Sequence, residues 1–325
     1  MKGRIVWIDY AKGIGIILVV FGHVIGGINS AGMDISKSFF TGAFSFVYGF
    51  HMPLFFFLSG LFVENWLNKE NKFHDKISTI LWPYFIWSIM QGAVNVLLSG
   101  YTNNSLTWSS LFYSILFSPI GQFWYLYVLF IYFILYYCFK KFLSIKIIYL
   151  VSLLFFLFNP SLNFWILDKI LLNFIFFVSG SLARNKIAKN LFLSINKLPL
   201  LIFSLIFIIA NFVYLENTDY FNLKIIGKLI IGYIGISFIV VLTIFLQRFK
   251  GKFFKSLQFL GKMSMIIYLA HILASSGFRI VAQKLGFENV FGHIIIGSLL
   301  GLALPILCYF ILERTNLTKF FLGKS

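Results

Sequence analysis

Long apolar stretches separated by short polar connections dominate the chain. Each stretch runs for about 20 residues, the length that an α-helix needs to cross a bilayer core about 30 Å thick. The predicted spans are 5–28, 38–63, 77–99, 121–139, 145–159, 163–183, 198–215, 224–247, 258–282 and 291–312. The stretch 106–118 is apolar but short, so it is either a re-entrant or interfacial segment or an eleventh span. The pattern predicts an all-α, polytopic membrane bundle of about ten transmembrane helices.

The positions of lysine and arginine test these spans, because short cytoplasmic loops of membrane proteins carry more of them than the opposite loops do. If the amino terminus is cytoplasmic, 20 of the 27 basic residues fall on the cytoplasmic side, and Lys12 lies inside the first span. The six on the outer side are Lys37, Lys169, Lys224, Lys228, Arg279 and Lys284. This asymmetry supports an even number of spans with both termini in the cytoplasm.

Composition agrees with a membrane protein, since 60% of the 325 residues are hydrophobic and 11% are charged. The net charge of +17 then reflects the positive-inside bias and attraction to anionic headgroups. We therefore expect the lipid bilayer, and no nucleic acid, as a partner. The two cysteines, Cys138 and Cys308, indicate neither a disulfide nor a metal site. No polar segment is long enough for a soluble domain, so residues 1–325 are expected to form one membrane-embedded domain.

The first span carries three ionisable side chains, Asp9, Lys12 and His23. A charge at bilayer depth costs roughly 2.5–3.5 kcal/mol, so this span indicates chemistry or transport. About three helical turns separate Lys12 from His23, which places both side chains on one face, roughly 16 Å apart. Asp9 and Lys12 form either part of a site or a buried ion pair, and Lys12 alone can extend to the headgroups.

The second span contains another histidine, His51, two residues before Pro53. Proline removes a backbone donor and is expected to kink the helix near the middle of the membrane. A buried imidazole facing lipid is expensive, so His51 is a candidate catalytic residue. Ser59 and Gly60 form either a packing face of small residues or a place where a ligand comes close.

Tyr268 and His271 are three residues apart in the ninth span and share one helical face. The tyrosine hydroxyl can fix the tautomer of the histidine or bind a polar substrate. Equally, the pair can form an interhelical hydrogen bond, and the sequence favours neither interpretation.

Two further candidates and two other histidines are expected nearer the membrane surface. Trp124 and Tyr125 open the fourth span, where aromatic residues are usually interfacial anchors but also suit the face of a sugar. His74 and His293 lie in or beside predicted loops, so they are expected to be solvated.

Four stretches of the chain, taken together, resemble the signature blocks of a known family. They are DYAKGIGIILVVFGH at 9–23, HMPLFFFLSG at 51–60, FWYL at 123–126 and GKMSMIIYLAH at 261–271. In this order they resemble the acyltransferase-3 family of membrane acyltransferases. Within it, they are most similar to the branch of fucose acetylase-like and capsule polysaccharide O-acetyltransferases.

The resemblance implies transfer of an acyl group, commonly acetyl from acetyl-CoA, to a hydroxyl group of a cell-surface glycan. The family's basic residue and its histidine in the first helix fall at Lys12 and His23. Many members have arginine in place of Lys12, and lysine lacks the planar fork that binds a phosphate in two places. The family also often carries two basic residues before the proline of its third helix. Lys76 matches one, whereas Ser78 and Thr79 stand where the second is expected.

These expectations combine into one mechanism without a metal. An acetyl-CoA donor in the cytoplasm carries phosphate charges that suit basic cytoplasmic loops. The basic residues concerned are Lys69, Lys72, Lys76 and those of 248–255. The thioester arm would lie beside Lys12 and Ser59. His23 would act either as general base towards the acceptor hydroxyl or as a transient acyl carrier, with His51 or His271 assisting.

A transporter or flippase for a glycan or lipid-linked intermediate is the alternative, because it also needs polar groups inside a helical bundle. Transporters often have repeated halves with broken helices at matching positions, and this chain shows no such repeat. The sequence therefore favours an enzyme of the bacterial cytoplasmic membrane with a glycan acceptor. A teichoic acid, a glycolipid or a small antibiotic is a further possible acceptor, and a homodimer is compatible with the sequence.

Overall fold

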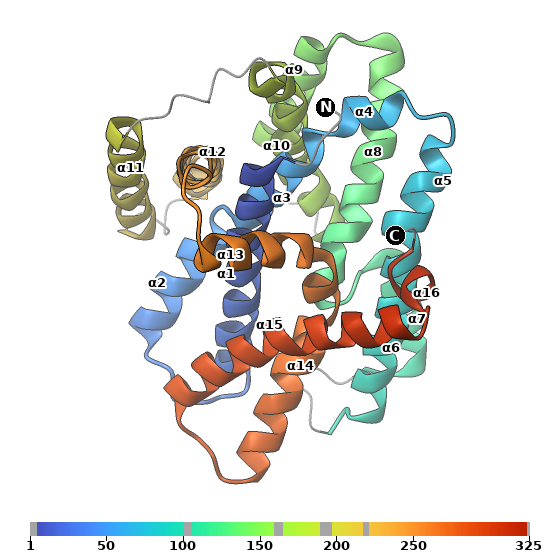
Figure 1. Cartoon of the computed structure of the whole chain (residues 1–325), viewed down its shortest axis with the longest axis vertical. Helices are drawn as coiled ribbons and strands as arrows, with labels where there is room; N and C mark the ends of the chain where they lie inside the picture. Colours follow the sequence, from blue (N-terminus) through green and yellow to red (C-terminus); the bar gives the residue numbers. More distant parts are fainter. Residues whose placement is uncertain (1–4, 101–105, 159–164, 189–196, 217–220, 324–325) are drawn as a thin grey trace. The chain divides into compact units, whose positions relative to one another are not determined.

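The computed structural model describes residues 5–100, 106–158, 165–188, 197–216 and 221–323 (Figure 1). None of these residues is in a strand, which confirms the predicted all-α fold. The chain divides into two compact units, each built from three separate stretches. Unit 1 comprises Met1–Ile16, Ser45–Lys69 and Tyr132–Lys262, and unit 2 comprises Ile17–Phe44, Glu70–Ile131 and Met263–Ser325.

Nine helical stretches within the described residues are long and apolar enough to cross a membrane. They are Val6–Ser30, Lys37–Gly60, Lys72–Leu97, Trp108–Phe142, Trp165–Arg184, Lys197–Leu215, Ile226–Leu246, Ser264–Lys284 and Val290–Arg314. The chain is therefore a multi-pass membrane protein. The prediction of about ten spans differs at 145–159, where α9 (Ile145–Leu157) has only 13 residues. Such a helix rises about 20 Å, less than the thickness of a bilayer core.

Unit 1 is organised around α3 (His51–Gly60) and α10 (Trp165–Ala188), which cross at two glycines. A Cβ atom on Gly60 would lie 1.9 Å from the carbonyl oxygen of Phe177, and one on Gly180 would lie 2.1 Å from that of Phe57. Glycine at both positions lets the two backbones touch, as at many helix crossings in membranes. Gly60 therefore serves packing. The other parts of unit 1 are the start of α1 (Val6–Ser30), the end of α2 (Lys37–Tyr48), α4 (Val63–Leu67), the second half of α8 (Trp124–Phe142), α9, α11 (Lys197–Glu216), α12 (Phe221–Leu246) and α13 (Lys252–Lys262).

The predicted span 38–63 is not one helix, because it divides into α2 (Lys37–Tyr48), α3 and α4. The kink expected at Pro53 is instead a break at Gly49 and Phe50, where Phe50 has φ −141° and ψ −16°. Its carbonyl oxygen accepts from the backbone N–H of Leu54 at 2.9 Å and so starts α3. Pro53 lies in the first turn of α3, where a missing N–H leaves no helical hydrogen bond unmade.

The predicted span 258–282 also began too early, since α13 ends at Lys262 and α14 (Ser264–Lys284) follows it. α13 is amphipathic: its lysines are exposed, while Leu257 and Gly261 are buried. A Cβ atom on Gly261 would lie 1.8 Å from the carbonyl oxygen of Asp9, so α13 lies directly against the first turns of α1. Such an amphipathic helix is typical of one that lies along the membrane surface and does not cross the membrane.

Unit 2 pairs α14 with α15 (Val290–Arg314), and the two contact each other more than any other helix pair in the described chain. The C-terminal α16 (Thr318–Leu322) is held by two tryptophans of α6 (Trp82–Leu97). Trp82 and Trp87 donate their indole N–H groups to the carbonyl oxygens of Phe320 at 2.6 Å and Phe321 at 2.8 Å. α5 (Lys72–Lys76) and the π-helix η1 (Ile77–Leu81) precede α6.

The short apolar segment 106–118 contains α7 (Trp108–Phe117), which begins at a capping box formed by Thr107 and Ser110. Its ten residues rise about 15 Å, so α7 alone does not cross a bilayer. The 3₁₀-helix η2 (Gly121–Phe123) then leads into α8. This turn brings polar residues to the site described next.

Candidate active site

A polar cavity of about 320 Å³ lies within unit 2. Its walls come from α1, α6, α14 and the start of η2. The hydrogen-bonding side chains on these walls are His23, Ser30, Gln91, Asn95, Ser276 and Arg279. Aliphatic side chains such as Leu273 and Ile280 complete the lining. Apolar walls with a few converging polar groups are typical of a small-molecule site.

His23, which the sequence predicted as general base or acyl carrier, lines this cavity from α1. Gly26 and Gly27, in the next turn, also line the cavity, so that backbone forms the wall beside the imidazole. The helix is continuous from Val6 to Ser30, as predicted, so Lys12 and His23 lie on one helix. They belong to different units, with Lys12 in unit 1 and His23 in unit 2.

His271 lies next to His23, with the two ring centroids 5.0 Å apart. It is completely buried, and its Nδ1 lies 3.0 Å from the carbonyl oxygen of Ile267 and 2.8 Å from that of Tyr268. Because carbonyl oxygens only accept, Nδ1 carries the proton, and Nε2 of the neutral ring is an acceptor. Nε2 is buried and has no hydrogen-bond partner among the described residues. The local helix therefore fixes the tautomer of His271.

Gln122 holds three elements together at this site. Its side-chain amide exchanges hydrogen bonds with the amide of Gln91, at 2.9 Å and 3.3 Å, and also donates to the carbonyl oxygen of Leu269 at 3.3 Å. The hydroxyl of Tyr268 donates to the backbone carbonyl of Gln122. α6, η2 and α14 are thereby joined by buried hydrogen bonds, which fix the position of the helix that carries His271.

Tyr268 thus makes an interhelical hydrogen bond, which was one of the two roles that its sequence position left open. Tyr125 is buried and packs edge to face against Tyr268, with ring centroids 5.6 Å apart. Trp124 is half-buried at the first position of α8. Among the described residues, the cavity lining includes neither Trp124 nor Tyr125, so the structure does not bring them together with His23.

Arg279 was counted among the basic residues of the outer side, and its position on a cavity wall was not predicted from the sequence. It lies within α14, is 7% exposed and lines the cavity, with one Nη donating to Oε1 of Gln283 at 3.0 Å. A signal was present in the sequence, because His271, Ser275 and Arg279 recur every four residues along one side of a helix.

His293 was expected to be solvated, and this was wrong. It lies in the first turn of α15, is 1% exposed, and its Nε2 lies 2.7 Å from the carbonyl oxygen of Phe287. A small hollow between α1, α14 and α15 is lined by His23, Arg279 and His293 together. His74, by contrast, is exposed in α5.

The remaining predicted residues of α1 and α3 lie in unit 1. Asp9 is buried, and its Oδ2 accepts from Nε2 of Gln258 at 3.4 Å. Lys12 is half-buried. His51 is 1% exposed, and its Nδ1 lies 2.7 Å from the carbonyl oxygen of Val47, across the break between α2 and α3. Its Nδ1 therefore carries the proton, as in His271.

Two further candidates lie towards the ends of their helices. Ser59 is half-buried beside the α3 and α10 crossing. Lys76 ends α5, with its Nζ 3.9 Å from Oδ2 of Asp75. The hydroxyls of Ser78 and Thr79 donate to the backbone carbonyl of Asp75 at 3.2 Å and 2.6 Å. These two residues therefore stabilise the turn into η1, where the family resemblance led us to expect a second basic residue.

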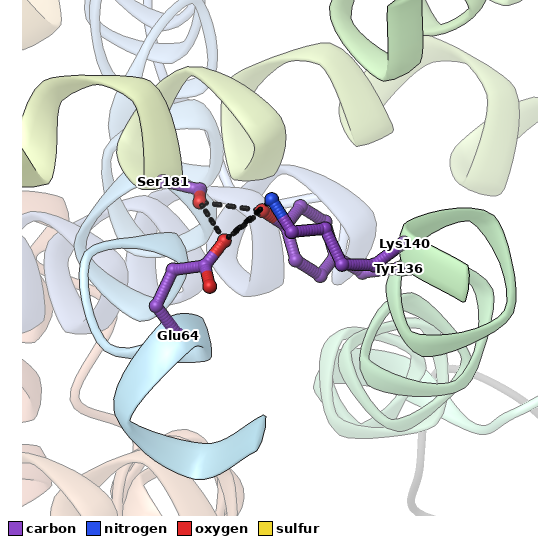
Figure 2. A network of polar contacts seen from close by, with 4 residues as sticks. All are labelled: Glu64, Tyr136, Lys140 and Ser181. Carbon is purple, nitrogen blue, oxygen red and sulfur yellow. Dashed lines mark hydrogen bonds and ion pairs between the residues drawn. The ribbon is translucent and has the colours of Figure 1, made fainter. Parts of the chain in front are cut away.

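A polar network in unit 1 was not predicted from the sequence (Figure 2). Oε1 of Glu64 in α4 accepts from the hydroxyl of Tyr136 at 2.6 Å and from Ser181 at 3.5 Å, and Nζ of Lys140 lies 3.5 Å away. The hydroxyls of Tyr136 and Ser181 are 2.7 Å apart. One carboxylate thus joins α4, α8 and α10. A glutamate directly after an apolar span was a signal that could have revealed it.

The arrangement in unit 2 can support acid-base chemistry. A half-buried imidazole lines a cavity and lies beside a second imidazole whose tautomer leaves an acceptor nitrogen. A histidine so placed can take a proton from a bound hydroxyl and return it to a leaving group. Among the described residues, no group of three histidine, cysteine, aspartate or glutamate side chains could hold a metal ion.

Comparison with known proteins places this cavity in a family context. Neither a curated protein nor a solved structure matches the chain. A family described as an acyltransferase domain matches residues 5–310, which include His23, His271 and all the described residues of the cavity. Because the match covers nearly the whole chain and the chain has the apolar helices of a multi-pass membrane protein, the protein belongs to the acyltransferase-3 family of membrane acyltransferases.

Proposed function

We propose that the protein is an O-acetyltransferase of the bacterial cytoplasmic membrane, which moves acetyl from acetyl-CoA to a sugar hydroxyl of a cell-surface polysaccharide or its precursor. Membership of the acyltransferase family supports acyl transfer. The observation that carries the proposal is the position of His23 on a polar cavity with the ring of His271 beside it. The resemblance to fucose acetylase-like and capsule O-acetyltransferases supports the acetyl group and the glycan.

The cavity suits a sugar as acceptor. Its amides and hydroxyls, those of Gln91, Asn95, Ser30 and Ser276, can each donate and accept hydrogen bonds, as sugar hydroxyls do. Its volume of about 320 Å³ is at the low end of the range of roughly 300–1,000 Å³ for ligand pockets. Such a cavity admits one or two sugar units of a longer chain.

In the proposed reaction, Nε2 or Nδ1 of His23 takes the proton of the acceptor hydroxyl as its oxygen attacks the thioester carbonyl. The carbon–sulfur bond then breaks, and the CoA thiolate receives the proton from the imidazolium. The acceptor nitrogen of His271 would stabilise the positive charge on His23 between these two events. Ester and free CoA are the products, and the protonation state of the enzyme is restored.

The donor is proposed to bind through the basic residues of the predicted cytoplasmic loops, since CoA carries several phosphate charges. Lys12 and Lys76 are the candidates that the family resemblance identifies. Lys12→Ala is expected to raise the KM for acetyl-CoA. Lys12→Arg is expected to raise this KM less, because arginine, like lysine, carries a positive charge. Equal KM values in all three forms would favour a lysine that only extends to the headgroups.

The decisive experiment compares surface glycan from a deletion strain that carries either the intact gene or its His23→Ala variant. Proton NMR of the purified glycan should show an O-acetyl signal, removable by mild base, with the intact gene only. Immunoblots of membranes must show equal amounts of both proteins. Glycan that reaches the surface only with the gene present, but never carries ester, would instead indicate a transporter.

A further inference from the structure

His23 lies at one end of the cavity, and a glycine of α14, Gly277, lines another part of its wall. From this arrangement we infer that the acyl acceptor is an oligosaccharide or a longer chain, and that the sugar unit next to the acylated one lies against Gly277. This inference rests on the proposed acyltransferase function of the cavity. It adds the length of the acceptor and a residue that determines specificity.

The lining residues show how the cavity runs. On both α1 and α14 they follow the spacing i, i+3, i+4 and i+7 of one helical face. They are His23, Gly26, Gly27 and Ser30 in α1, and they include Leu273, Ser276, Gly277 and Ile280 in α14. Within the described part of α1, no residue before His23 lines the cavity, so the cavity extends from His23 towards the end of this helix at Ser30.

Two contacts align the helices along the cavity. The ring of His23 lies beside that of His271, and a Cβ atom on Gly27 would lie 3.9 Å from Nε of Arg279. Both helices therefore run in the same direction from the paired rings. Gly277 follows His271 by six residues, which is a rise of about 9 Å. This distance exceeds the length of one sugar unit, so a second unit lies at Gly277 when the first has its hydroxyl at His23.

Helix packing does not account for Gly277. A Cβ atom on Gly60, Gly180 or Gly261 would lie within 2.1 Å of a backbone carbonyl oxygen, so glycine is required at these crossings. Outside the neighbouring turns of its own helix, no described atom lies within 4 Å of a Cβ atom on Gly277. The space beside Gly277 belongs to the cavity that this residue lines.

Backbone conformation does not account for Gly277 either. It lies inside the continuous helix α14 and is not among the described glycines with a positive φ angle. Glycine weakens the interior of a helix relative to alanine, and its usual uses are special backbone angles and close approach of a neighbouring group. Close approach of a ligand is the use that remains. The hydroxyl of Ser276, beside Gly277 in the cavity wall, can bind a hydroxyl of the same sugar unit.

The test measures acetyl transfer by purified protein in detergent from radiolabelled acetyl-CoA to two acceptors. Both come from the unacetylated surface glycan of the deletion strain, the oligosaccharides by partial hydrolysis and the monosaccharides by complete hydrolysis. The oligosaccharides should have a kcat/KM at least about tenfold above that of the monosaccharides, because they fill both parts of the cavity. Equal values for the two acceptors would overturn the inference.

Variants of Gly277 locate the second sugar unit. Alanine and leucine are both strong helix formers, so Gly277→Ala and Gly277→Leu differ in side-chain volume more than in helix propensity. Gly277→Leu should raise the KM for the oligosaccharides at least about tenfold, and Gly277→Ala should raise it less. The KM values for the monosaccharides and for acetyl-CoA should stay the same. Gly42→Leu is the matched control: Gly42 lies in α2 with equally open space, is not among the described lining residues, and should change nothing.

These variants also separate room for a ligand from flexibility of the helix. Both substitutions stiffen α14, so a hinge at Gly277 would lose activity equally in the two variants and towards both acceptors. That result would contradict the inference. Melting temperatures should not fall in either variant, because no described atom has to move to admit the first added carbon.

A measurement that does not depend on transfer uses Gly277→Cys in a protein whose native Cys138 and Cys308 are replaced by serine. The oligosaccharides should slow modification of the new thiol by a water-soluble thiol reagent, and the monosaccharides should not. Equal rates with and without the oligosaccharides would also overturn the inference. Failure of the proposed function has a different signature, namely binding of acetyl-CoA without transfer to either acceptor, while protection of the thiol persists.

Discussion

The imidazole rings of His23 and His271 lie with their centroids 5.0 Å apart and their planes inclined by 54°. The first ring lines the cavity, and the second is buried behind it with its Nδ1 proton directed to backbone carbonyls of its own helix. A charge that forms on His23 during proton transfer therefore has an uncharged ring with a lone pair beside it. This relationship makes His271 a positioning residue whose role can be tested separately from that of His23.

We expect replacement of His271 to lower kcat rather than to raise the KM for the acceptor. A hydrogen bond to a charged group contributes about 1.5–3 kcal/mol, so His271→Leu should reduce kcat by about 10- to 100-fold. His271→Gln should retain more activity, because its amide oxygen can replace Nε2 as an acceptor. Steady-state kinetics of the two purified variants provide the measurement. Equal kcat values for Leu and Gln would mean that the ring acts through packing alone.

The crossing of α3 and α10 predicts a specific loss of stability. In Gly60→Ala the new Cβ atom would meet the carbonyl oxygen of Phe177 at 1.9 Å, a backbone atom that cannot rotate away. Overpacking of this kind typically costs about 1–3 kcal/mol. The melting temperature in detergent should therefore fall clearly below that of the unaltered protein.

Gly42→Ala is the matched control for this crossing. Gly42 lies within α2, and no described atom lies within 4 Å of the position of a new Cβ. Alanine is a better helix former than glycine by about 1 kcal/mol, so this variant should be as stable as the unaltered protein or more stable. Similar losses in both variants would argue against the close crossing.

The network around Glu64 predicts a second loss of stability, in unit 1. Glu64→Gln removes the charge that attracts Lys140 and weakens the acceptor of the Tyr136 hydroxyl, so we expect a loss of about 1–3 kcal/mol. Glu70→Gln makes the same change at an exposed position and should have no effect. Tyr136→Phe, alone and combined with Glu64→Gln, completes a double-mutant cycle by thermal unfolding. Additive losses would show that the two side chains do not interact.

Most of the fold could be predicted from the sequence, because apolar length and loop charge are local signals. Val6–Ser30 and Val290–Arg314 lie within a few residues of their predicted bounds. The errors lie where hydropathy carries no information on backbone direction. Phe50 breaks a largely apolar stretch, and α13 joins α14 through a single residue, Met263.

The candidate site was predictable only in part. His23 and His271 stand out because ionisable groups are rare in apolar helices, and the structure places their rings together. His293 was misassigned, since an ionisable residue near the end of a span is indistinguishable in sequence from one in a loop, and the burial of Arg279 on a cavity wall was not predicted. Gln91 had a weak signal, one of two amides in an apolar helix, and the residue that it contacts is not visible without the fold.

The paired amides of Gln91 and Gln122 have a consequence for how this protein can change during evolution. Each amide is buried, and each supplies both the donor and the acceptor that the other requires. Replacing one alone leaves a buried polar group without its partner, at a cost of about 1–3 kcal/mol, whereas replacing both with apolar residues can be nearly neutral. Descendants of this sequence should therefore either inherit the two glutamines together or lose them together.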